Sequence, residues 1–222
     1  MCGRFAQAIP VSTLKIFFDI QKILSHTPPS YNITPSHEIL TITAEKERTL
    51  RTMTWGFIPG WGREKTAPFK PLINARAETL REKPAFRNSF KHKRCLIIAD
   101  GFYEWQTQGK EKIPYFIKLT SGDPMAFAGI YERYIPEKGG EILTCAIITT
   151  AAGNCLEQIH NRMPVIIPKK NINIWLDTTC ELNESGSGRI FAPIPDNKIT
   201  FYQVSRDVNS PLNNNPELII PV

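Results

Sequence analysis

Residues 95–105 read Cys-Leu-Ile-Ile-Ala-Asp-Gly-Phe-Tyr-Glu-Trp. The first five residues form an apolar run that is short enough to be a buried strand. The pair Asp100-Gly101 is typical of a turn, and the aromatic residues after it favour a second strand over Phe102–Thr107. This stretch therefore predicts two strands that follow each other with only a turn between them.

The same patterning predicts elements on both sides of this stretch. Further strands are expected at Ile39–Thr43, Thr49–Ile58, Tyr115–Leu119, Ala126–Tyr131 and Leu143–Thr149, near Phe201 and near Leu218, with a short buried stretch at Leu72–Ala75. Helices are expected at 12–25 behind a Ser12 cap, at Ala77–Arg81, at Ala85–Lys91, from Asn154 toward His160 behind an Asn154/Glu157 capping box, and at Asn171–Asp177. Loops are expected at His26–Ser36, Pro59–Pro71 and Ser185–Gly188. Strands and helices mixed without regular alternation indicate an α+β fold.

Composition and charge narrow the class of protein. Residues 1–222 contain no stretch that is typical of a flexible linker, so we expect one domain. Five cysteines without a close pair argue against a disulfide framework and against a zinc site, and favour a reducing, cytoplasmic compartment. No apolar run is long enough to span a bilayer. The net charge of +6 favours anionic partners, with nucleic acid first.

The amino terminus carries the most unusual chemistry. If Met1 is removed, Cys2 presents an α-amine beside its thiol, which no internal cysteine does. An α-amine with a pKa of about 7.7 to 8.0 can attack an aldehyde and form an imine. The thiol can then close a five-membered thiazolidine ring, because intramolecular attack has a large effective molarity. The alternative is that Cys2 is a small buried residue in a first strand.

A second candidate segment is Asn74-Ala75-Arg76. An extended backbone places Asn74 and Arg76 on one face and Ala75 on the other. Asn74 could orient the amine or a sugar oxygen, and Arg76 could hold a phosphate. The alternative is a strand end at which Arg76 forms an ion pair with Glu78.

Two titratable residues and three tryptophans complete the set of candidates. Glu104 lies among aromatic residues that would raise its pKa, as suits a proton shuttle, although it could instead bind backbone amides. His160 precedes Arg162 after a predicted helix and is a candidate acid or base, or a structural histidine. The sequence favours a core position for Trp55 and DNA stacking for Trp61, and leaves both open for Trp105.

Together these segments resemble the SRAP (SOS response-associated peptidase) family over almost the whole chain. The matching motifs are Met1-Cys2-Gly3-Arg4-Phe5, Tyr31-Asn32-x-Thr34-Pro35, Trp55-Gly56-x-x-Pro59-x-Trp61, Asn74-Ala75-Arg76-x-Glu78-Thr79, Ala99-Asp100-Gly101-Phe102-Tyr103-Glu104-Trp105, His160-x-Arg162-Met163-Pro164 and Ser205-x-x-Val208-Asn209. Two segments depart from the family pattern, 62–70 and Asn213-Asn214-Asn215-Pro216, which puts local DNA contacts in doubt.

The resemblance implies a branched, barrel-like, mostly antiparallel sheet flanked by helices, and a monomer without cofactor or metal that binds single-stranded DNA. It implies that Cys2 forms a thiazolidine with the aldehyde of an abasic site, and that the family's peptidase activity removes Met1. The implied catalytic residues are Cys2, Asn74 for positioning, Glu104 for proton transfer and His160 for forming or reversing the link. The implied DNA-binding residues are Arg4, Arg76 and Arg162, to which the tryptophan pattern adds Trp61 and Trp105.

Three alternatives remain open from the sequence. A thiol peptidase would use Cys2 and His160 on peptides in trans. A noncatalytic single-strand or RNA-binding module would use the arginines and tryptophans alone, with Cys2 as packing. A structural or redox role of the cysteines is disfavoured by their scattered spacing.

Overall fold

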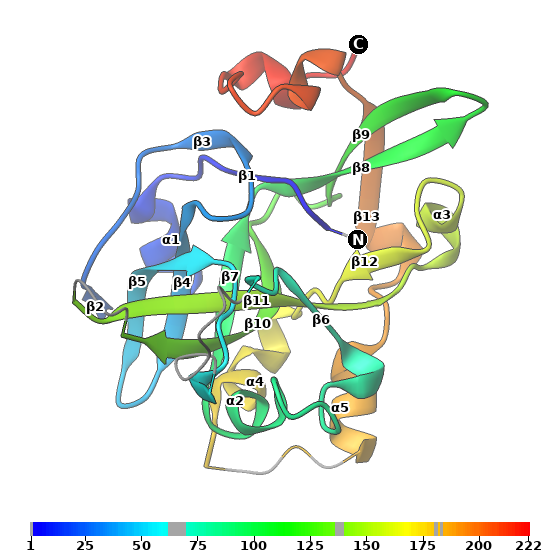
Figure 1. Ribbon diagram of the computed structural model, residues 1–222. Coiled ribbons are helices and arrows are strands. Elements are labelled where there is room, and N and C mark those ends of the chain that lie inside the picture. The colour runs from blue at the N-terminus through cyan, green and yellow to red at the C-terminus, as the bar shows by residue number, and fades with distance from the viewer. Residues whose placement is uncertain (1, 62–69, 136–139, 180–181, 183) are drawn as a thin grey trace.

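Five strands close into a barrel, which forms the lower half of the molecule in Figure 1. The computed structural model describes residues 2–61, 70–135, 140–179, 182 and 184–222. The barrel strands, in spatial order, are β11 (Ile142–Ala151), β10 (Met125–Tyr134), β7 (Arg94–Ala99), β4 (Glu38–Ala44) and β5 (Arg48–Trp55). Neighbours in this order are antiparallel, and a parallel pairing of β5 with β11 closes the ring through Thr54↔Thr144 and Trp55↔Cys145.

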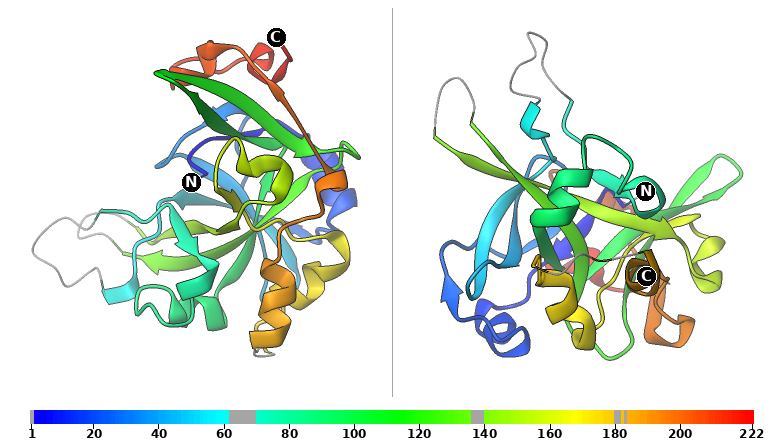
Figure 2. Two further views of the ribbon diagram at one scale, coloured as in Figure 1. Left: turned by 90° about the vertical axis from the view of Figure 1, so that its right-hand side faces the viewer. Right: turned by 90° about the horizontal axis from the view of Figure 1, so that it is seen from below.

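A second, five-stranded sheet lies over the barrel. Its strands, in spatial order, are β13 (Ile199–Gln203), β9 (Glu111–Leu119), β8 (Gly101–Gln108), β1 (Phe5–Gln7) and β3 (Ser30–Ile33). In the left view of Figure 2 the dark-blue amino-terminal segment lies between the β8–β9 hairpin and the barrel. The chain crosses from barrel to second sheet at Asp100, whose carboxylate accepts a hydrogen bond from the Ala8 amide at 2.5 Å. The branched, barrel-like α+β architecture implied by the sequence is therefore confirmed.

Short elements fill the remaining positions around the barrel. The further strands are β2 (Lys22–Ile23), β6 (Asn74–Arg76) and β12 (Arg162–Pro164). The α-helices are α1 (Val11–Phe17), α2 (Arg87–His92), α3 (Asn154–Glu157), α4 (Ile172–Leu176) and α5 (Glu184–Phe191), and 3-10 turns span Ala77–Thr79, Lys169–Asn171, Asp196–Lys198, Arg206–Asn209 and Pro216–Ile219. No helix in the described part of the chain is long and apolar enough to cross a membrane.

The alternation of side chains along the barrel strands divides the core into two clusters. On β7 the even positions Leu96 and Ile98 belong to a cluster that also contains apolar residues of α1, α2 and α4. The odd positions Cys95 and Ile97 belong to a cluster that contains Cys2 and residues of the second sheet. Because both faces of β7 are covered, all six of its residues are buried, which explains the continuous apolar run in the sequence.

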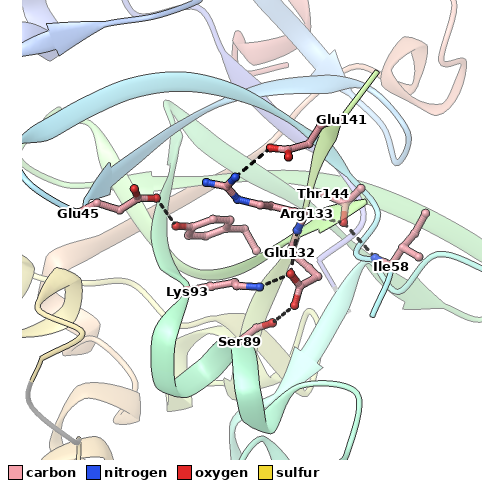
Figure 3. Close-up of polar contacts among 9 residues, drawn as sticks. Glu45, Ile58, Ser89, Lys93, Glu132, Arg133, Glu141 and Thr144 are labelled. Carbon is pink, nitrogen blue, oxygen red and sulfur yellow. Dashed lines mark hydrogen bonds and ion pairs between the residues drawn. The ribbon is translucent and has the colours of Figure 1, made fainter. Parts of the chain in front are cut away.

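A polar cluster joins α2 to the barrel (Figure 3). Glu132 of β10 is only 6% exposed, and its carboxylate accepts hydrogen bonds from the Lys93 ammonium and from Ser89 Oγ at 3.2 Å. Nearby, Thr144 Oγ1 accepts a hydrogen bond from the Ile58 amide at 3.1 Å. The buried carboxylate is thus paired with an opposite charge and further hydrogen bonds, which offset the cost of removing it from water.

Several sequence predictions are wrong at the level of single elements. The helix expected over 12–25 ends at Phe17, because the chain turns at Asp19 with a φ of 52°, and Leu24 is 55% exposed after β2. Pro10, not Ser12, occupies the N-cap position of α1. Likewise Gly153 is the N-cap of α3, so the predicted capping box does not form.

The polar segments were also misassigned in places. The Ser185–Gly188 segment expected as a loop belongs to α5, and Leu218 lies in a 3-10 turn where a strand was expected. Strand β3 forms within the predicted loop 26–36, because its backbone pairs with β1. For β3, local composition favoured a loop, and pairing with a distant segment made it a strand.

Gly101 is a position where any side chain should destabilise the fold. A Cβ built there would lie 2.5 Å from the backbone oxygen of Ile117 and 2.6 Å from the Phe116 ring. The oxygen belongs to β9, which pairs with β8 and cannot move alone. We expect Gly101→Ala to lower the free energy of unfolding by about 3 kcal/mol, measured by urea denaturation. Gly140→Ala, with no atom within 4 Å of the new Cβ, is the matched control, and equal midpoints for the two variants would contradict this expectation.

Candidate active site

Cys2 lies just before β1, inside the apolar cluster that the barrel shares with the second sheet. The residue is fully buried. Burial first, and then the negative charge of Glu104, raise the pKa of the Cys2 thiol above its ordinary value. The sulfur therefore keeps its proton at neutral pH unless a base is brought to it.

Asn74 holds the backbone of Cys2. Its Nδ2 donates a hydrogen bond to the Cys2 carbonyl oxygen at 2.9 Å, across 72 residues of sequence. β6 pairs in parallel with β11, with Asn74 opposite Ile147, so Ala75 is buried while Arg76 is exposed. The extended segment with alternating faces is confirmed.

The other end of the Asn74 amide has an unused acceptor. Its Oδ1 is buried and has no hydrogen-bond partner among the described residues. Buried polar atoms are rarely left unsatisfied in native proteins, and those that are call for a functional explanation. This oxygen is therefore available to an amine or hydroxyl beside Cys2.

Glu104 supplies a carboxyl group that exchanges its proton near neutral pH. It is the fourth residue of β8 and is 5% exposed. Burial raises the pKa of the Glu104 carboxyl to about 7. Its negative charge helps to raise the pKa of the Cys2 thiol, and both residues are buried. Glu104 can therefore act next to Cys2 both as an acid and as a base.

His160 and Arg162 lie at the start of β12. His160 Nδ1 lies 3.0 Å from the Arg162 amide nitrogen and 3.3 Å from the Arg162 carbonyl oxygen. Because a backbone amide can only donate and its contact is the shorter, we assign Nδ1 as the acceptor and place the proton of the neutral ring on Nε2. Burial lowers the pKa of His160 from its ordinary value. The ring is therefore neutral and oriented at physiological pH.

The Arg162 guanidinium is bound within the protein. Nη1 and Nη2 donate to the two carboxylate oxygens of Glu78 at 2.5 and 3.0 Å, and Nη2 also donates to the Thr149 carbonyl at 2.7 Å. The ion-pair partner of Glu78 is therefore Arg162, and not Arg76 as in the alternative considered from the sequence. The ion pair lowers the pKa of the Glu78 carboxyl, chiefly through the hydrogen bonds from Arg162.

Arg4 and Trp105 form a second group beside the amino terminus. Arg4 Nη1 donates to Asn32 Oδ1 and to the Val208 carbonyl, both at 2.6 Å. Its guanidinium lies 5.8 Å from the centre of the Trp105 ring, and Trp105 Nε1 donates to Asn209 Oδ1 at 2.7 Å. The structure thus brings together motifs from both ends of the chain, and it fixes the Trp105 ring in one orientation.

The remaining candidates differ in exposure. Trp55 is fully buried and donates its Nε1 hydrogen to the Ile73 carbonyl, so the predicted core position is confirmed. Trp61 is 40% exposed, and most of the predicted basic loop after it, 62–69, lies outside the described residues. Arg76 projects from β6 next to Asn74 as an exposed cation.

Sequence reasoning missed two residues that organise this region. Asn32 is 1% exposed and binds Arg4 and the carboxy-terminal segment. Its place in the Tyr31-Asn32-x-Thr34-Pro35 motif could have identified it from the sequence. Thr149 is fully buried against Arg162, and nothing in the strand pattern distinguished it from its neighbours. Among the described residues, no group of three or more metal-binding side chains occurs.

Comparisons with known proteins agree with this architecture. The family model for SOS response associated peptidase (SRAP) matches residues 1–211. The abasic site processing protein YoqW of Bacillus subtilis is 43% identical over 223 residues, which cover 99% of each chain. The abasic site processing protein YedK of Escherichia coli is 32% identical, and the match covers 100% of each chain.

A crystal structure of a protein from Bacteroides thetaiotaomicron has a TM-score of 0.90 against this chain, with 26% identity and full coverage of both chains. A second crystal structure, from Bordetella bronchiseptica, has a TM-score of 0.79 at 25% identity and covers 92% of this chain. Motifs, fold and sequence identity agree over the whole length, and this chain belongs to the SRAP family.

Proposed function

We propose that this protein processes abasic sites in single-stranded DNA by linking Cys2, after removal of Met1, to the sugar aldehyde as a thiazolidine. The observation that carries the proposal is the arrangement around Cys2. Its carbonyl is held by Asn74, and its sulfur lies in range of a carboxyl group whose pKa is near 7. The relatives named abasic site processing proteins supply the substrate class.

The reaction is balanced without an oxidant or a cofactor. The neutral α-amine of Cys2 adds to the aldehyde carbon, and loss of one water, with a proton from Glu104, gives the protonated imine. The thiol then adds to the imine carbon and returns a proton to Glu104, so the ring nitrogen ends neutral with one hydrogen. Glu104 donates a proton to the departing hydroxyl group and later accepts the thiol proton, because both of its protonation states are populated near pH 7.

Exposure of the amine requires cleavage of the Met1–Cys2 peptide bond. In the proposed self-processing, the Cys2 sulfur attacks the Met1 carbonyl carbon, the Cys2 nitrogen is released as an amine, and one water hydrolyses the thioester. Glu104 or His160 is the base. The Cys2 thiol is fully buried, which keeps it from peptides in trans, whereas the Met1 carbonyl is joined to the same residue.

Binding of the DNA strand is assigned to cations and rings around the amino terminus. Arg76 is exposed beside Asn74 and can reach a phosphate. Arg4 and Trp105 form a packed pair, and Trp61 exposes part of its ring for stacking on a base. Arg162 can contribute only if its contact with Glu78 leaves room for a phosphate oxygen.

The test is conjugation to DNA. Protein whose mass confirms loss of Met1 should form a denaturation-resistant product with a single-stranded oligonucleotide that contains one abasic site. A duplex with the same site should react poorly, and a tetrahydrofuran analogue, which has no aldehyde, should give no product. Denaturing gels and intact mass spectrometry measure the yield. Equal yields with the aldehyde and with the analogue would rule out the proposed chemistry.

A further inference from the structure

The Glu78–Arg162 ion pair crosses β11 between the two segments that carry Asn74 and His160. Arg162 lies opposite Ala151 on one side of β11, and Arg76 lies opposite Thr149 on the other side. Glu78 lies two residues beyond Arg76 in the 3-10 turn Ala77–Thr79, and its carboxylate meets the Arg162 guanidinium. The pair therefore connects β6 and β12 directly across the strand that separates them.

The geometry of this pair differs from that of an ordinary surface ion pair. Two parallel N–H···O bonds of 2.5 and 3.0 Å join the side chains, an arrangement that fixes orientation as well as distance. The Arg162 side chain is 14% exposed, and Thr149 binds its Nη2 through both the carbonyl and the Oγ1 atom. Four hydrogen bonds thus immobilise one guanidinium at this position.

The same arginine residue orients His160. Its backbone amide donates to His160 Nδ1, so any shift of Arg162 moves the hydrogen bond that fixes the ring and its neutral tautomer. On the opposite side of β11, Glu78 follows Asn74 by four residues and lies in the 3-10 turn that continues β6. Movement at Glu78 therefore changes the position of His160 relative to Asn74.

We propose that Glu78 is a positioning residue, whose contact with Arg162 holds the His160 ring in a fixed position relative to Asn74 and Cys2 for the reaction of the aldehyde. The expected effect on the reaction rate rests on the proposed function. Its structural part, the orientation of the His160 ring, is independent of that function.

The kinetic test separates positioning from DNA affinity. At saturating abasic oligonucleotide, Glu78→Gln should lower the rate of conjugation roughly 10- to 100-fold, because small displacements of reacting groups are costly. Its dissociation constant for the tetrahydrofuran oligonucleotide, and the dependence of that constant on salt, should match wild type. Glu111→Gln, which removes an exposed ion pair with Arg206, is the matched control and should react like wild type.

The double variant Glu78→Gln/Arg162→Gln shows whether the two residues act as a unit. If they do, the double variant should react no more slowly than the slower single variant. A change of affinity and salt dependence with an unchanged saturated rate would overturn the proposal, and would mean that Glu78 only tunes a phosphate contact of Arg162. An unchanged rate and affinity would overturn it as well.

A measurement without DNA keeps the inference distinguishable from the proposed function. In ¹⁵N NMR spectra of the wild type, neutral His160 should carry its proton on Nε2, because Nδ1 accepts from the Arg162 amide. In Glu78→Gln the two tautomers should mix. Identical spectra in both proteins would overturn the positioning role even if wild type conjugates. If wild type fails to conjugate while the tautomers differ as expected, only the proposed function is lost.

Discussion

Cys2→Ala should abolish the stable conjugate with abasic single-stranded DNA, with a loss of yield of about 100-fold or more. The alanine variant keeps an α-amine and can form an imine, but it has no sulfur to close the ring. Without the intramolecular step the imine is returned to aldehyde by water. Wild type and variant are compared with residue 2 verified by mass as the first residue, on denaturing gels after hours in neutral buffer.

Two further variants separate the amine from the thiol. Cys2→Ser should give little stable product but should be trapped by borohydride, because a hydroxyl group closes a much weaker ring than a thiol. Cys155→Ala removes another cysteine, half-buried on α3, and should conjugate like wild type. A Cys2→Ala protein that conjugates as well as Cys155→Ala would eliminate the thiazolidine mechanism, and would leave the noncatalytic binding module as the better description.

Glu104→Gln should slow conjugation by roughly 10²- to 10⁴-fold, the usual contribution of a positioned acid or base. The amide has nearly the same shape but neither gives nor takes a proton. In wild type the reaction needs the protonated Glu104 carboxyl, with a pKa of about 7, and the neutral α-amine, with a pKa of about 7.7 to 8.0. The rate should therefore pass through a maximum between these values, and its fall at higher pH should disappear in the variant.

The folding stability of Glu104→Gln provides an independent check on the raised pKa of the Glu104 carboxyl. Below pH 4.5, the ordinary value for glutamate, the carboxyl is neutral in both the folded and the unfolded chain. Between pH 4.5 and about 7 only the unfolded chain ionises, so wild type loses stability as the pH rises. At pH 8 Glu104→Gln should be more stable than wild type by about 3 kcal/mol in urea denaturation. A variant that is destabilised at pH 8, or that reacts at the wild-type rate, would contradict the role given to Glu104.

Local sequence patterns were sufficient for the barrel strands. The apolar run at 95–99, the Asp100-Gly101 turn and the strand after it occur where predicted, as β7 and β8. The reason is that a strand covered on both faces needs continuous apolar residues, and a turn needs residues such as Asp and Gly that can adopt its backbone conformation. Where the prediction failed, as at the end of α1, the deciding contacts came from β5, which pairs with β2.

The candidate site also has one part that the sequence predicts and another that only the tertiary structure shows. The sequence by itself singled out Cys2, Asn74, Glu104 and His160, because each carries reactive or hydrogen-bonding groups in an unusual local setting. It also determined the order of apolar residues that buries Cys2 between the barrel and the second sheet.

Only the tertiary structure decided which of these groups meet. Arg76 lies two residues from Glu78 but is not its ion-pair partner, whereas Arg162 binds Glu78 across 84 residues of sequence. The physical reason is that β6 and β12 both pair with β11 in a fixed register, and the 3-10 turn that follows β6 carries Glu78 to Arg162. Side-chain chemistry is a property of each residue, but contact between distant residues depends on how the strands pair.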